Sequence, residues 1–222
     1  MIYVLLFTSV FIGYLLALIL KVKEVKTLSI YLAFSGAFLL ALTIFELLPE
    51  VYKGPTESIG VYIISGILLQ IVLEFFSQGA EHGHVHVHEY TNSFPWLLFI
   101  SLSIHALLEG VPITENNNLL IGIMVHKIPI ALILSIFFIK ANYKKTTTLL
   151  FLFLFGLMTP LGNWFSNNFE IIQNYHIEIT AVAIGVFFHV STTILFESSK
   201  NHQFNVSKMS AVILAILIAY FI

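Results

Sequence analysis

Cysteine, arginine and aspartate are absent from this chain of 222 residues. Without cysteine the chain forms no disulfide bond and offers no thiolate, so imidazole and carboxylate are the side chains left to bind a metal ion. Charge is also scarce, at 10% of residues, where soluble domains average about a quarter. The formal net charge is only -2 and no basic stretch stands out, so we expect no nucleic-acid partner.

Apolar residues are abundant instead, at 58% of the chain, with a mean hydropathy of +0.94. These values predict an all-α polytopic membrane protein, with residues 1–222 forming a single domain embedded in the lipid bilayer. The first apolar run follows no basic segment and precedes no small-residue cleavage site, so we expect a retained span rather than a signal peptide. At about 20 apolar residues per crossing, eight transmembrane helices are expected, near 2–20, 28–52, 59–78, 94–113, 118–139, 147–166, 176–197 and 205–222.

The lysines predict the orientation of the spans. All of them except Lys53 and Lys127 lie in, or border, the connections that follow the first, fifth and seventh spans. Such connections face the same side of the membrane, and basic residues near span ends favour the cytoplasmic side. We therefore expect an even number of spans, both termini outside the cytosol, and a location in the cell (plasma or inner) membrane.

A histidine-rich loop at 79–93 separates the third and fourth spans on the expected cytoplasmic side. His82, His84, His86 and His88 alternate within it, which is typical of tracts that bind metal ions. We expect these histidines to contact metal weakly, without forming the main site. A flexible polar loop with no metal role is the alternative.

The fourth and fifth spans carry ionisable side chains at a depth where an unpaired charge is expensive. His105 and Glu109 share one helix face because they are four residues apart. His126 lies at a similar depth in the next span, counting a rise of about 1.5 Å per residue from the connection between them. We predict that His105, Glu109 and His126 bind one divalent metal ion and leave a coordination position open for water.

Two purely structural roles for these residues, without metal binding, remain open. In the first, Glu109 pairs with His105 or neutralises Lys127, and the group is a structural ion pair. In the second, the polar side chains hold the helices together. Lys127 itself either extends to water along its aliphatic stem or takes the place of a second ion.

Two carboxylates and an amide are candidates for an ion pathway. Glu46 and Glu50 share a face at the outer end of the second span. They are either ordinary solvated residues at a helix end or carboxylates that attract cations to the outer opening of the pathway. Asn163 follows a Pro-Leu-Gly break in the sixth span, which is expected to re-aim that helix. We include all three in the predicted pathway.

Deeper toward the expected cytoplasmic side, the seventh span contains His189. It is either a core histidine bonded to Ser191 or Thr192, or a ligand on the exit path. In the third span, Glu74 is expected to reach the nearby interface.

Several of these motifs together resemble the ZIP family of divalent-metal transporters. The resemblance is carried by HALLEG at 105–110, HKIPIA at 126–131, ELLPE at 46–50, LMTPLG at 157–162 and the histidine-rich loop. It implies a 3+2+3 arrangement of eight helices and homodimers in many members. It also implies uptake toward the cytosol, by movement of a bundle holding the fourth and fifth spans against a scaffold.

Three departures from the family pattern concern a second metal position. Where many members carry ligands for a second ion, this chain has Ala106, Lys127 and Ile130. The resemblance therefore implies one intramembrane metal, with the Lys127 ammonium standing in for the second. Glu46 also replaces a histidine of the family's second-span motif.

These observations predict a carrier rather than an enzyme, with the metal ion as substrate and no resident cofactor. Zinc is expected first, because imidazole–carboxylate ligation accommodates it well, and iron or manganese next. No GxxxxGK[ST] motif supports ATP-driven pumping. The alternative is an intramembrane zinc-dependent hydrolase, in which the metal activates water and Glu109 acts as the base.

Overall fold

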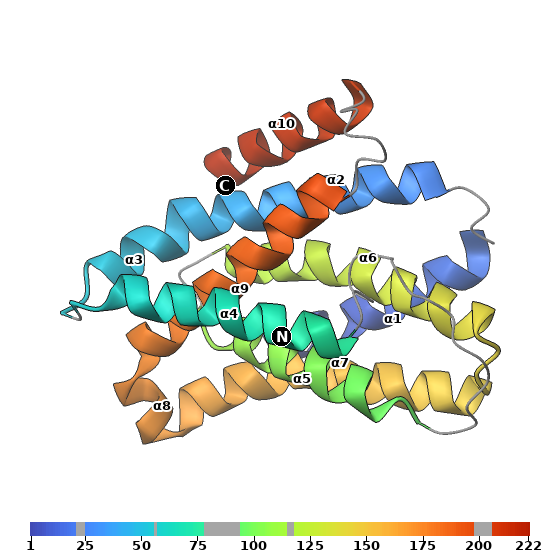
Figure 1. Cartoon of the computed structure of the whole chain (residues 1–222), viewed down its shortest axis with the longest axis horizontal. Coiled ribbons are helices and arrows are strands. Elements are labelled where there is room, and N and C mark those ends of the chain that lie inside the picture. Colours follow the sequence, from blue (N-terminus) through green and yellow to red (C-terminus); the bar gives the residue numbers. More distant parts are fainter. Residues whose placement is uncertain (21–24, 56, 78–93, 115–117, 198–205) are drawn as a thin grey trace.

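The computed structural model describes the chain except residues 21–24, 56, 78–93, 115–117 and 198–205. The described part is helical and contains no strand (Figure 1). The loop histidines His82, His84, His86 and His88 lie outside the described residues, so their predicted metal contact stays a prediction.

Helices occupy all eight of the predicted spans. The first three spans are α1 (Ile2–Leu20), a rod of three consecutive segments, and α4 (Ile59–Ser77). The rod consists of α2 (Val25–Leu42), a π-helical turn η1 (Thr43–Leu47) and α3 (Leu48–Tyr52). The remaining helices are α5 (Trp96–Gly110), α6 (Leu119–Lys140), α7 (Lys145–Asn168), α8 (Glu170–Asn174), α9 (His176–Glu197) and α10 (Val206–Phe221).

Six of the helical segments in the described part are long and apolar enough to cross a membrane. The other two, α5 and α10, are apolar but have only 15 and 16 residues. Large apolar side chains such as Leu15, Val61, Leu68 and Phe75 are exposed along the outer faces, where a soluble protein would bury them. The chain is therefore an integral membrane protein, as its composition predicted.

The helices pack in two groups. In the first, α1 lies along α6 and α7, and α5 lies along α7. In the second, α4 lies along α9, and α2 lies along both α9 and α10. Contacts of α2 with α6 and of α4 with α5 join the groups.

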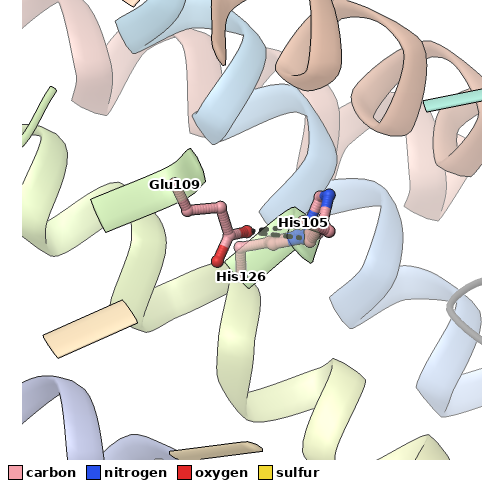
Figure 2. A group of neighbouring side chains, drawn as sticks. All are labelled: His105, Glu109 and His126. Atoms are coloured by element: carbon pink, nitrogen blue, oxygen red, sulfur yellow. Dashed lines mark ion pairs between the residues drawn. The ribbon is translucent and has the colours of Figure 1, made fainter. Parts of the chain in front are cut away.

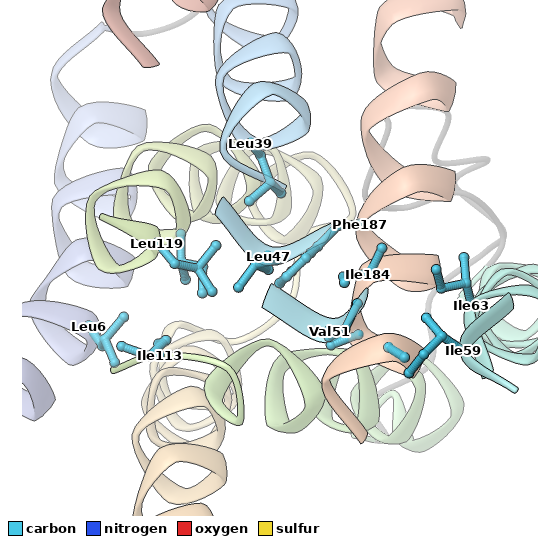
Figure 3. Close-up of a cluster of buried hydrophobic side chains, with 13 residues drawn as sticks. Leu6, Leu39, Leu47, Val51, Ile59, Ile63, Ile113, Leu119, Ile184 and Phe187 are labelled. Carbon is cyan, nitrogen blue, oxygen red and sulfur yellow. The ribbon is translucent and has the colours of Figure 1, made fainter. Parts of the chain in front are cut away.

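Each group has buried apolar contacts, and a larger core joins them. Val10, Leu102, Leu134 and Phe151 belong to a buried cluster inside the first group. The joining core holds residues such as Leu6 of α1, Leu119 of α6 and Phe187 of α9 (Figure 3). Such shared packing fixes α5 and α6 relative to the helices around them.

Two glycines let α5 and α7 meet with their backbones in contact. A Cβ atom on Gly162 would lie 2.0 Å from the Leu107 carbonyl oxygen, and one on Gly110 would lie 2.2 Å from the Thr159 carbonyl oxygen. No side chain larger than hydrogen fits at either position without a shift of the helices. This close approach brings Thr159 beside Glu109, in the buried interior.

Candidate metal site

His105, Glu109 and His126 meet between α5 and α6, as their spacing and depth predicted. All three side chains are buried, and one ligand atom from each lies within 4.8 Å of the others. Figure 2 shows the Glu109 carboxylate directed at both rings. Its Oε1 atom is 3.0 Å from His105 Nε2 and 3.9 Å from His126 Nε2.

These distances suit a small cation. Two ligands that each lie about 2.1 Å from a tetrahedral zinc ion are about 3.4 Å apart. The distances of 3.0 Å and 3.9 Å between Glu109 Oε1 and the two histidine Nε2 atoms fall on either side of that value. The set contains two imidazoles and one carboxylate, which leaves the fourth tetrahedral position for water. The residues therefore fit one divalent transition metal after small side-chain movements.

Lys127 is buried beside this group and does not extend to water. Its side chain is only 2% exposed, and its Nζ atom lies 2.8 Å from Glu109 Oε2. The same Nζ lies 4.7 Å from the centre of the Phe155 ring, close enough for a cation–π contact. Of the two alternatives for Lys127, the snorkelling one is wrong.

The two oxygens of Glu109 therefore have different partners. Oε1 faces the histidines, whereas Oε2 faces Lys127 and accepts a long hydrogen bond of 3.5 Å from Thr159 Oγ1. The structural ion pair and the metal-binding geometry thus coexist on one carboxylate. Neither reading of Glu109 excludes the other.

The cavity between these side chains is small. Its volume is about 10 Å³, which is close to the room that one water molecule requires. Besides the charged residues, it is lined by Leu102, Ile130 and Phe155, which are apolar and limit access of water. The space suits one ion together with its ligands.

Gln70 is a neighbour of the site that our sequence analysis missed. It lies on α4, is completely buried, and places its Oε1 atom 3.0 Å from His105 Nδ1. When this oxygen accepts the bond, Nδ1 carries the ring proton and Nε2 keeps a lone pair for a metal. The signal was a single amide in the apolar run ILLQIVLEFF, since polar side chains in a membrane helix usually bond to another helix.

Asn163 of the predicted pathway lies beside the end of α5. It is buried on α7, and its Nδ2 donates to the carbonyl oxygens of Gly110, at 3.2 Å, and Ile113, at 2.7 Å. Asn167 donates in turn to Asn163 Oδ1 at 3.2 Å. The Gly110 carbonyl also accepts a bond of 3.4 Å from the Ile113 N–H, so Asn163 adds to the hydrogen bonding at the end of α5.

Glu46 and Glu50 lie at the end of the second span, as expected, but in different surroundings. Glu46 accepts two hydrogen bonds of 2.9 Å from Asn118, one from its backbone N–H and one from its side-chain amide. Asn118 precedes the first residue of α6, so the carboxylate also lies near the positive end of that helix. Glu50 is exposed.

His189 pairs with Glu74 of α4, not with Ser191 or Thr192. Its Nε2 atom bonds to Glu74 Oε2, and the two side chains are 19% and 22% exposed. The Thr192 hydroxyl donates instead to the backbone carbonyls of Phe188 and His189. The pairing adds a partner for Glu74, and the expectation that its side chain reaches the nearby interface stays a prediction.

The fold and the site together define an integral membrane protein with a buried imidazole–carboxylate centre. In sequence, the chain is similar to Zinc transporter ZIP1 of Danio rerio, with 36% identity over 87 residues. This match covers 36% of the chain and 29% of the relative. Protein zntD of Dictyostelium discoideum is 32% identical over 104 residues, which are 39% of the chain and 15% of that protein. No family model matches.

These matches confirm the resemblance to the ZIP family of divalent-metal transporters that the motifs predicted. The chain spans less than a third of the length of each relative. Neither match supports the alternative of an intramembrane hydrolase.

Proposed function

We propose that the protein carries a divalent transition-metal ion across the membrane toward the cytosol, with zinc as the first candidate and iron or manganese next. The observation that supports this most is the convergence of His105, Glu109 and His126 within 4.8 Å of one another. The similarity to Zinc transporter ZIP1 of Danio rerio supports zinc. The ion is a substrate, so the site must release it, and three ligands with an open position allow release.

All eight apolar helical segments cross the membrane in this proposal. The 15 residues of α5 rise about 22 Å, which is shorter than the roughly 30 Å of hydrocarbon in a bilayer. The Phe94–Pro95 entry and the turn through Ile113 add length at its two ends. The resulting order is three helices (α1, α2–α3, α4), the two site helices (α5, α6) and three more (α7, α9, α10), which is a 3+2+3 arrangement.

Transport requires the site to face each side in turn, and the two packed groups suggest how it does so. The group of α1, α5, α6 and α7 carries the three ligands and moves against the group of α2, α4, α9 and α10. The lysines at 140, 144 and 145 face the cytosol, which places both termini outside. Assembly as a homodimer follows the family resemblance and belongs to the same proposal.

A single ion occupies the site, and Lys127 replaces a second one. Its ammonium lies 2.8 Å from Glu109 Oε2, the oxygen that points away from the histidines. A fixed positive charge there repels a second cation, and the cavity of about 10 Å³ has room for one. Glu46, Glu50, Asn163 and His189 line the proposed path on either side of this centre.

Reconstituted protein tests the function directly. We expect vesicles containing the wild type to take up Zn²⁺, and uptake to fall to background in His105→Ala and Glu109→Gln. His176→Ala is the matched control, because His176 is a half-buried histidine at the start of α9. Unchanged uptake in both site variants would refute the assignment, whereas zinc-dependent hydrolysis without uptake would favour the hydrolase.

A further inference from the structure

A groove lined by apolar side chains lies between α2, α9 and α10, away from the metal site. Its volume is about 110 Å³, several times the room that one water molecule requires. Ala37 and Ala41 of α2, Leu195 of α9 and Val212 of α10 are among its lining residues. An apolar cavity of this size takes up hydrocarbon in preference to water.

The groove runs beside a close contact between α2 and α10. Ala37 and Ala41 belong to one buried cluster with Ala215 and Ala219 of α10. Small side chains of this kind let two membrane helices approach closely. Because the two alanines of α2 are short, they also leave space on the flank of the contact, where Val212 forms the facing wall.

The groove is open toward the surroundings of the protein. Ile44 and Phe45 of η1 and Ile216 of α10 line it, and these side chains are 42%, 41% and 40% exposed. In an integral membrane protein, exposed apolar side chains of a spanning helix face the hydrocarbon of the bilayer. Turns of the π-helical type are rare and are frequent at functional sites. The surroundings therefore supply an acyl chain as the occupant.

Lys208 adds a positive charge to the same face of α10. Lys208, Val212 and Ile216 follow one another at intervals of four residues, so they share one face of the helix. Lys208 lies roughly 6 Å along the axis from Val212. Its side chain is partly exposed, and no carboxylate among the described residues forms an ion pair with it. An ammonium thus lies beyond one end of the apolar groove, free to bind an anion.

This end of the groove belongs to the lysine-rich end of the molecule. In Figure 1, α2 and α10 both begin at the end where α6 passes into α7. Lys208 lies in the first turn of α10, Lys26 in the first turn of α2, and Lys140 at the end of α6. Lysines near span ends favour the cytoplasmic side, where anionic lipids attract them. The chemistry that fits both parts of the groove is that of an anionic phospholipid.

We propose that the groove and Lys208 form a binding site for an anionic phospholipid of the cytoplasmic leaflet. The Lys208 ammonium binds the phosphate, and one acyl chain lies in the groove along Val212 and Ile216. At its far end the chain contacts the η1 turn, which also carries Glu46, the partner of Asn118. The inference goes beyond the proposed function, and only the choice of leaflet rests on the proposed orientation.

Native mass spectrometry of the purified full-length protein tests the charged part of the site. Phosphatidylglycerol and phosphatidylcholine with identical acyl chains are titrated separately. We expect one phosphatidylglycerol to bind saturably and more tightly than phosphatidylcholine. Lys208→Met weakens this binding roughly fivefold, the effect of one lysine near a membrane surface, and leaves phosphatidylcholine unaffected. Lys144→Met is the matched control and retains the affinity, because Lys144 is an exposed lysine before α7.

A tryptophan in the groove tests the apolar part. Val212→Trp fills the space, so we expect it to abolish saturable binding of both lipids. Leu214→Trp is the matched control, because Leu214 is 53% exposed on the same helix and does not line the groove. Equal unfolding temperatures of the two variants show that Val212→Trp is folded.

Three results overturn the lipid site: equal affinity for the two lipids, unchanged affinity in Lys208→Met, or equal lipid binding in the two tryptophan variants. A wild type that binds no lipid but forms a dimer, which Val212→Trp separates, also overturns it and assigns the groove to a contact between two copies. His105→Ala is expected to bind the lipid as the wild type does. The lipid result is therefore independent of the metal site and of the proposed function.

Discussion

Gln70 of α4 fixes the orientation of the His105 ring on α5, because its side-chain oxygen is hydrogen-bonded to His105 Nδ1. The bond places the proton on Nδ1 and leaves Nε2 for the metal, which is the common role of residues that support a histidine ligand. We expect Gln70→Leu to weaken zinc binding roughly 10- to 100-fold. Gln70→Glu keeps an acceptor at this position and retains most of the affinity.

Zinc affinity is measured by competition with a chelator in detergent. The matched control is Gln173→Leu, because Gln173 is an exposed glutamine of the short helix α8. Equal affinities of Gln70→Leu and the wild type would show that the bond to His105 has no part in metal binding.

Lys127 neutralises Glu109 in the absence of metal, at a depth where an unpaired carboxylate is costly. Replacing it by methionine removes the positive charge and keeps most of the aliphatic volume. Breaking a buried pair in this way typically costs about 3–5 kcal/mol, so we expect Lys127→Met to unfold at a clearly lower temperature without zinc. Added zinc restores the missing charge and stabilises this variant more than the wild type.

Thermal unfolding of both proteins, with and without Zn²⁺, measures this difference. Lys140→Met serves as the control, because Lys140 is exposed at the end of α6 and its loss is expected to be neutral. An unfolding temperature that is the same in Lys127→Met and the wild type would contradict the role of Lys127 as a counter-ion.

The packing of α5 on α7 depends on the absence of side chains at two positions. A methyl group at Gly162 would lie 2.0 Å from a backbone oxygen, and a backbone cannot move away as a flexible side chain can. We expect Gly162→Ala to destabilise the fold by about 1–3 kcal/mol and to weaken zinc binding, because α5 carries two of the ligands. Thermal unfolding and zinc titration of the purified variant measure both effects.

Gly60→Ala is the matched control in a different helix. Beyond the backbone of its own helix and its chain neighbours, no atom lies within 4 Å of the Cβ position at Gly60, so a methyl group there has open space. Its stability should equal or exceed that of the wild type, because alanine favours a helix over glycine. A Gly162→Ala protein as stable as Gly60→Ala would mean that α5 and α7 separate at no cost.

Local spacing explains why part of the site was predictable and part was not. His105 and Glu109 belong to one helix, so the four-residue interval alone places them together, and counting residues from the connection brings His126 to the same depth. The bond from Gln70 depends on how α4 packs against α5, which no interval in the sequence encodes.

The helices were predicted more completely than their contacts. Apolar runs of about 20 residues predicted where all eight helical segments lie, and six of these segments are long and apolar enough to cross a membrane. The π-helical turn at Thr43–Leu47 was not foreseen, nor was the bond from Asn118 to Glu46, since both depend on tertiary packing. For the same reason, the sequence did not predict that His189 pairs with Glu74 of α4 instead of with a nearby residue of its own helix.

The orientation of the entire chain is testable because it has no cysteine, so that any single cysteine introduced is the only reactive thiol. Lys53 and Lys144 are exposed and lie in connections that are expected to face opposite sides of the membrane. An impermeant maleimide should label Lys53→Cys in intact cells. Lys144→Cys should react only after the cells are permeabilised, and the reverse pattern would contradict the proposed orientation.

The bond between Gln70 and His105 joins the two groups of helices that move against each other in the proposed transport cycle. If α5 shifted along α4 in that cycle, the bond between His105 Nδ1 and Gln70 would break, and the ring proton would no longer be fixed on Nδ1. The affinity for the ion would then differ between the two arrangements by the contribution of that one bond. Occupancy of the site would therefore favour the arrangement in which the bond is intact, and the affinity for the ion would be higher in that state than in the other.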